Sequence, residues 1–437
     1  MPKLDISSDE LMARLLGLSH EWQVAILDSC GVGHLGSKLL IAGIDPVETS
    51  ELSRSEVNES LNALTLAVEG ELPCIFTLSY EFGLLLNGIR SRHFSRTEPH
   101  IFLARFKNLI VHNYATKTTH VLGPDPQQVV ERLLDTSNLA AYEIGRHATL
   151  LSSSFSKSEY LAAVSEIQEE IRSGNTYQAN IVQRFEAEIG DLDPQAIFVR
   201  LRRDHPAAFA AFIQRARSTV VSVSPERFFR IAGGIIEASP IKGTAPRVGD
   251  EAIDKKTRET LLNSRKDNAE NTMIVDLLRN DLGRVCDFGS IVVTKLCDLE
   301  EHPTLFHLVS TIRGQLKQNA GFADVIRALF PCGSITGAPK ISTMKIIDRV
   351  EKAARGLSMG AIGYSIPNAF ETEGSGLSSG IDTNVAIRTM VIRDGIAAFS
   401  TGGGIVSDSE PDLEYGEMLL KAKALFAALG INSTEFL

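Results

Sequence analysis

The chain has 437 residues, of which 43% are hydrophobic, so it can bury a large core divided over two or three structural units. Its formal net charge is −10 and it has no block of lysine and arginine, which argues against binding to nucleic acid. Five scattered cysteines without a C-x-x-C pair suggest neither a zinc site nor a disulfide framework, and no apolar run is long enough to predict a transmembrane helix. We therefore expect a cytoplasmic protein without membrane contact.

Residues 1–150 are expected to form an N-terminal α/β unit. Apolar and β-branched residues predict strands at 21–27, 73–78 and 101–106 and a hairpin at 108–114 and 118–122. Pro124-Asp125-Pro126 then opens a helix that runs to about residue 134. A serine-rich junction at 150–156 separates this unit from a catalytic unit of residues 151–437.

The catalytic unit begins with a predicted helix. Ser156 is a suitable N-cap, Tyr160, Val164 and Ile167 recur on one face, and Gly174 ends the helix.

A glutamate and an isolated lysine follow further along the chain. Lys242 lies in Ser239-Pro240-Ile241-Lys242-Gly243-Thr244, sixteen positions after Glu226, with no carboxylate close by in sequence. A lysine in its neutral form can act as a nucleophile, and a nearby glutamate can give or take a proton. The alternative is a surface lysine on a turn.

Two predicted helices each carry a pair of carboxylates on one face. Asp267 and Glu270 are three residues apart near the start of one helix, and Glu414 and Glu417 have the same spacing in the last helix. They could simply complement the helix dipole or form a Glu417–Lys421 ion pair. Carboxylates from two helices could instead meet and hold a hard divalent cation such as Mg²⁺.

Three further segments are suited to binding an anionic ligand. The run Gly402-Gly403-Gly404 follows a predicted strand at 396–400 and lets backbone N–H groups approach a ligand. Arg388 lies in an apolar segment, 381–389, predicted as a strand, and its planar guanidinium suits a carboxylate. The Gly/Ser/Thr/Pro loop at 329–340 precedes an amphipathic helix. Alternatives are a flexible bend for the glycines and an edge strand with Arg388 in water.

Seven motifs in order, between about residues 155 and 425, resemble the chorismate-utilising enzymes, which aminate or hydrate chorismate. The matching stretches are residues 173–180, 224–228, 240–244, 270–281, 334–340, 387–389 and 403–421. The resemblance implies an α+β chorismate-binding fold: two stacked, mostly antiparallel sheets flanked by outer helices, with the active site in the cleft between them.

The resemblance also implies roles for individual residues. Glu226 would protonate the C4 hydroxyl as Lys242 attacks C2. Mg²⁺ would be held by Glu270 and Glu417, with Asp267 and Glu414 in support. The residues expected to bind substrate are Gln178, Thr244, His307, Thr336, Tyr364, Arg388, Gly402, Gly403, Gly404 and Lys421. Structural histidine is the alternative reading of His307.

Two positions discriminate within the family. Members that add water carry a lysine base where this chain has Gln178, which favours ammonia as the nucleophile. Lys242 stands where anthranilate-forming members have alanine, which favours amination at C4 to 4-amino-4-deoxychorismate, on the route to 4-aminobenzoate and folate. The ammonia would come from a separate glutamine amidotransferase subunit. Anthranilate synthase, isochorismate synthase and a non-catalytic chorismate or tryptophan sensor remain alternatives.

Two further positions bear on the resemblance. Cys332 occupies a position where the family usually has glycine, so the geometry of the loop near Thr336 is open. Ser29 lies in a motif that holds tryptophan in some members, and whether tryptophan binds here is undecided.

Overall fold

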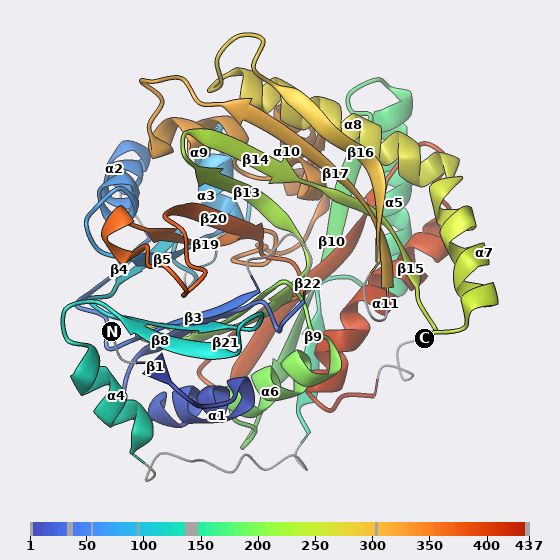
Figure 1. The fold of residues 1–437 in the computed structure, drawn as a ribbon. Coiled ribbons are helices and arrows are strands. Elements are labelled where there is room, and N and C mark those ends of the chain that lie inside the picture. The colour runs from blue at the N-terminus through green and yellow to red at the C-terminus, as the bar shows by residue number, and fades with distance from the viewer. Residues whose placement is uncertain are drawn as a thin grey trace.

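Two stacked antiparallel sheets form the centre of the protein in the computed structural model, which describes residues 3–32, 38–53, 56–93, 95, 97–135, 147–301 and 305–432 (Figure 1). All described strand pairs are antiparallel, so the expected α+β fold of two stacked sheets with outer helices is confirmed.

The larger sheet has twelve strands. Its strands in spatial order are β1 (Lys3–Leu4), β8 (Thr118–Leu122), β7 (Leu109–Asn113), β3 (Leu39–Ile44), β2 (Val24–Asp28), β11 (Phe209–Gln214), β12 (Thr219–Ser224), β21 (Thr389–Arg393), β22 (Ile396–Ile405), β10 (Gln178–Glu188) and β18 (Gly337–Ala338), with β9 (Thr149–Ser153) paired to β10.

The smaller sheet has ten strands. They are β15 (Ile241–Pro246), β17 (Leu305–Gln315), β14 (Ile235–Ser239), β13 (Arg227–Ala232), β20 (Gly380–Val385), β19 (Ala361–Ile366), β5 (Cys74–Leu78), β6 (Ile101–Arg105) and β4 (Glu48–Leu52), with β16 (Val292–Glu301) paired to β17. Residues before 150 contribute strands to both sheets, so the segments on either side of that position share one architecture.

Helices cover the outer faces of both sheets (Figure 1). The larger sheet is covered by α1 (Ser8–Leu18), α4 (Pro126–Leu134), α5 (Lys157–Arg172), α6 (Pro194–Asp204), α10 (Lys340–Val350) and α11 (Pro411–Ala428). The smaller sheet carries α2 (Val57–Val68), α3 (Tyr80–Leu86), α7 (Glu251–Leu262), α8 (Arg265–Gly283) and α9 (Phe322–Leu329), and short turns η2 (Gly333–Ile335) and η3 (Asn368–Phe370) complete the fold.

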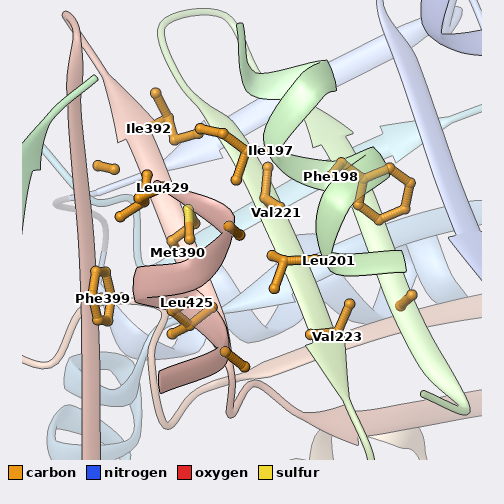
Figure 2. Packing of buried hydrophobic residues seen from close by; sticks show 14 of the residues in the cluster. Ile197, Phe198, Leu201, Val221, Val223, Met390, Ile392, Phe399, Leu425 and Leu429 are labelled. Atoms are coloured by element: carbon orange, nitrogen blue, oxygen red, sulfur yellow. The ribbon is translucent and has the colours of Figure 1, made fainter. Parts of the chain in front are cut away.

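The three largest apolar clusters form layers because strand residues alternate between faces. One cluster lies between the larger sheet and its helices, a second lies between the smaller sheet and its helices, and a third fills the space between the sheets. Figure 2 shows the first layer, where Ile197 and Leu201 of α6 and Leu425 of α11 pack over the strands. This packing holds α6 and α11 in place over the strands of the larger sheet.

Most predicted elements are found, with small changes at their ends. The Ser156 capping box opens α5 as expected. The predicted strand at 21–27 begins only at Val24, because the turn after α1 extends through Trp22. The predicted strand at 381–389 is wrong as a single element: β20 ends at Val385, the chain leaves the smaller sheet, and β21 begins at Thr389 in the larger one. No described helix is long and apolar enough to span a bilayer.

Candidate active site

Glu226 lies where the chain passes from β12 in the larger sheet to β13 in the smaller one. The side chain is 5% exposed, and its Oε1 has no hydrogen-bond partner within the described chain. Burial raises the pKa of Glu226, against the lowering effects of the Lys242 ammonium and of a hydrogen bond from Ser334. A carboxyl group in this setting favours its protonated form and can donate a proton.

Lys242 lies on β15, opposite Leu308 of β17, at a bulge in the ladder between Lys242 and Thr244. Its charge acts on the carboxyl groups of Glu226 and Glu270, which places all three groups in one site. In the part of the chain that the structure describes, its ammonium has no hydrogen bond or ion pair. The amine is therefore available to a ligand in this site.

Two residues near Lys242 on β15 and the neighbouring strand β17 are hydrogen-bonded to each other. The Thr244 hydroxyl and the Nδ1 of His307 are 2.9 Å apart, on directly paired residues of β15 and β17. His307 is buried, so this bond supports the histidine beside the lysine strand. Both residues belong to the set predicted to bind substrate.

The η2 loop approaches Glu226 from another side. The Ser334 side chain forms a hydrogen bond with the carboxyl group of Glu226, and its Oγ lies 3.3 Å from the Cys332 Sγ. Thr336 is fully buried and donates its hydroxyl to Cys332 O at 3.0 Å, so this hydroxyl stabilises the loop itself. Cys332 thus fits the loop, and its thiol contacts the serine that reaches the carboxyl group.

Gln178 on β10 and the glycine run of β22 form the part of the candidate site that lies on the larger sheet. Gln178 is 1% exposed, and its Oε1 has no partner among the described residues. A Cβ on Gly404 would lie 2.1 Å from Gln178 Nε2, so glycine is required there for the amide to lie over β22. Gly402 approaches β10 equally closely, since a Cβ would lie 1.9 Å from Ile181 O. Gly403 faces Glu414 and Lys421.

Glu270 of α8 and Glu417 of α11 both lie within the influence of the Lys242 charge. Burial raises the pKa of Glu270, and the charges of Asp267 and Glu417 raise it further, while Lys242 lowers it. Burial would also raise the pKa of Glu417, but the neighbouring lysines, Lys421 above all, hold it below its ordinary value. Lys421 lies 2.8 Å from Glu417 and donates to Gly402 O at 3.0 Å.

This acidic cluster fits a hard cation in part. Glu270 and Glu417 offer carboxylate oxygens, and the mutual repulsion that raises the pKa of Glu270 would be relieved by a positive ion. Within the described ranges, no three acidic, histidine or cysteine side chains are close enough together to hold a metal by themselves. The arrangement matches a magnesium site with one or two protein carboxylates and other oxygens from water and substrate.

Arg388 lies in the crossing from β20 to β21 and has a left-handed backbone, with φ of 48°. Burial lowers the pKa of its guanidinium, and no carboxylate of the described chain pairs with it. Its charge lowers the pKa of His205, secondary to burial of that histidine. A buried guanidinium without a carboxylate partner in the described chain is suited to binding an anionic ligand.

Tyr364 and Ser29 lie elsewhere, in a cavity of about 40 Å³ between the sheets that Asp382 also lines. Of the residues predicted to bind chorismate, Tyr364 alone lines this cavity. The Ser29 hydroxyl is buried without a partner in the described chain. The volume holds a few water molecules, so tryptophan would require side chains to move.

One group that sequence reasoning missed is the fully buried Arg355. It binds Glu351 through Nε at 2.9 Å and Nη2 at 2.7 Å, and donates to Ile335 O and Asn180 O. It thereby ties the η2 loop to β10, the strand of Gln178. Its position in a short segment between α10 and β19 carries no periodic signal, so only the Glu351-x-x-x-Arg355 spacing, which suits an ion pair, could have indicated it.

Comparisons with known proteins agree with this geometry. Residues 31–427 match the family model described as chorismate binding enzyme. The chain is 44% identical over 271 residues to the aminodeoxychorismate synthase of Streptomyces pristinaespiralis, covering 62% of this chain and 36% of that protein. It is 41% identical over 277 residues to component 1 of the Escherichia coli enzyme, covering 63% and 59%. The chain thus spans about three fifths or less of these relatives.

A solved structure is similar over a larger share of the chain. Anthranilate synthase component I of Streptococcus pneumoniae superimposes with a TM-score of 0.77 and 25% identity, covering 89% of this chain and 92% of that one.

Proposed function

The chain belongs to the chorismate binding enzymes, and on that premise we propose that it is an aminodeoxychorismate synthase component I, which aminates chorismate at C4 to 4-amino-4-deoxychorismate. The observation that carries this proposal is the shared site of Lys242 and Glu226, where a ligand-accessible amine acts on a buried carboxyl group of raised pKa. The names of the two aminodeoxychorismate synthase relatives support the same choice.

The reaction follows from what these two groups can do. Glu226 gives its proton to the C4 hydroxyl, which leaves as water, while the neutral amine of Lys242 forms a bond to C2 and both ring double bonds shift, from C1–C2 and C5–C6 to C1–C6 and C4–C5. Ammonia then bonds to C4, the two double bonds shift back, and the Lys242 nitrogen leaves C2 as a neutral amine. A proton of the added ammonia returns to Glu226. Chorismate and ammonia thus give the amino product and water. Because there are two successive displacements, the amine ends on the same face of the ring as the hydroxyl that left.

The remaining residues bind and orient the substrate. Arg388 and the backbone near Gly403 would hold a carboxylate, and Gln178 carries an amide that cannot itself act as a base to activate water. Glu270 and Glu417 would hold Mg²⁺, with Asp267 and Glu414 in support, and the ion would supply charge for the ring carboxylate.

The proposal extends to partners and location. Ammonia would be supplied by a glutamine amidotransferase subunit, in line with the name component 1 of the Escherichia coli relative. We place the reaction in the cytoplasm, on the route to 4-aminobenzoate and folate.

Incubation with chorismate, ammonium and Mg²⁺ tests the proposal. We expect 4-aminobenzoate only after a separate aminodeoxychorismate lyase is added. Direct fluorescence of anthranilate would refute the assignment in favour of the second candidate, anthranilate synthase, which the Streptococcus pneumoniae structure favours. Product formed without ammonium would indicate an isochorismate synthase instead.

Substitution of the lysine tests the covalent step. Lys242→Ala should abolish amination, whereas Lys256→Ala, which removes an exposed lysine of α7, should retain it. Full amination by Lys242→Ala would exclude the bond to C2 and reopen the anthranilate assignment.

A further inference from the structure

Lys266 lies among the acidic side chains proposed to hold the metal. It is the second residue of α8, and its Nζ is 3.3 Å from Glu414 Oε1 on α11. That carboxylate is 4% exposed and also accepts a hydrogen bond from Ser409 at 2.7 Å. The Lys266 charge acts on Glu270, one turn along its own helix, and on Glu417 across the gap. One ammonium therefore neutralises carboxylates of both helices.

The other two lysines of this cluster have different surroundings. Lys421 is bound to Glu417 and to the carbonyl of Gly402, and Lys242 lies on the strand that faces Glu226. The side chain of Lys266 is 49% exposed, so its flexible stem can turn toward solvent while the buried Glu414 stays in place. Lys266 is thus the cation that can most readily leave this site.

We propose that Lys266 is a tethered counter-ion of the acidic cluster, and that its ammonium competes with a divalent cation for the carboxylates of Glu270 and Glu417. The inference rests on the proposed function, which supplies the metal. The lysine neutralises the carboxylates when no metal is bound, and so weakens metal binding before substrate arrives. A substrate carboxylate would add the negative charge and oxygen ligands that favour the metal over the ammonium.

Metal binding without substrate tests this role, with Mn²⁺ as a spectroscopic probe for Mg²⁺. Free Mn²⁺ is measured by electron paramagnetic resonance as it is titrated into the protein. Lys266→Met removes the competing charge and should tighten Mn²⁺ binding by about tenfold or more. Lys266→Arg keeps the charge and should bind as the unsubstituted protein does. Lys157→Met is the matched control, because it removes a lysine paired with Asp412 at the start of α11.

Lys266→Gln serves as a second neutral variant, and thermal unfolding of each variant verifies its fold. Unchanged or weaker Mn²⁺ binding by folded Lys266→Met and Lys266→Gln would overturn the proposal, and so would failure of every variant to bind Mn²⁺. The experiment uses no chorismate and no turnover, so its result is independent of whether the amination assay succeeds.

Discussion

Substituting Glu226 by glutamine should lower activity and raise stability at the same time. Glutamine keeps the shape of the side chain and removes the proton that the leaving hydroxyl needs. General acid catalysis contributes about 10²–10⁴ in rate, so kcat should fall by that factor, equivalent to about 3–5 kcal/mol of activation free energy.

The stability change follows from the raised pKa of Glu226. An acid whose pKa is higher in the folded than in the unfolded state contributes stability that is fully present below the unfolded pKa and is lost as the pH rises through the folded pKa. Glu226→Gln does not ionise, so its free energy of unfolding should rise relative to the wild-type protein as the pH rises above the ordinary range of glutamate.

The assay is lyase-coupled 4-aminobenzoate formation at saturating ammonium, together with denaturant unfolding at pH 5 and pH 8. Glu259→Gln, which changes an exposed residue of α7, is the control and should leave both quantities unchanged. If Glu226→Gln keeps more than about a tenth of the rate, Glu226 is not the acid. If it does not gain stability between pH 5 and pH 8, burial of the charge is not what raises the pKa.

Three other substitutions test packing and the burial of a carboxyl group. Gly404→Ala should displace the buried Gln178 amide, lower the free energy of unfolding by about 1–3 kcal/mol and raise the KM for chorismate, whereas Gly416→Ala, with open space around its Cβ position in α11, should stabilise by about 0.5–1 kcal/mol. Glu81, whose pKa burial raises to about 7, accepts the backbone N–H groups of Arg355 and Gly356. Its own contribution to stability is present below about pH 4.5 and lost through about pH 7, so Glu81→Gln should be most destabilising at low pH, as measured by unfolding across pH 4–8. A penalty that does not change with pH would contradict that reasoning.

Local patterns predicted much of the fold because strand and helix periodicities are properties of short segments. The hairpin at 108–122 and the capping box of Ser156 are found where the sequence indicates them. What these patterns cannot show is which sheet a strand joins. The segment 381–389 carries apolar residues in both halves, yet its two ends lie in different sheets, since both sheets are covered by apolar side chains.

The same limit applies to the site. Motif positions predict that carboxylates of α8 and α11 share a region with Lys242, and in the structure the charge of Lys242 acts on Glu270 of α8 and Glu417 of α11. They did not indicate that Tyr364 faces the cavity of Ser29 rather than Glu226. Tyr364 lies on β19, where neighbouring residues point to opposite faces, and a motif match alone does not specify which face lies toward the ligand.

The chain crosses between the sheets twice near the site, from β12 to β13 and from β20 to β21. Glu226 lies in the first crossing and Arg388 in the second, so neither residue belongs to a strand. Val385 N–H donates to Glu226 O, and Val223 N–H donates to Arg388 O, so the crossing segments hydrogen-bond each other where the regular ladders end. Backbone groups are thereby satisfied at a point where side chains from both sheets can meet. A substitution that separates these crossings would therefore move Glu226 relative to Gln178 and Gly404, even if every catalytic side chain were retained.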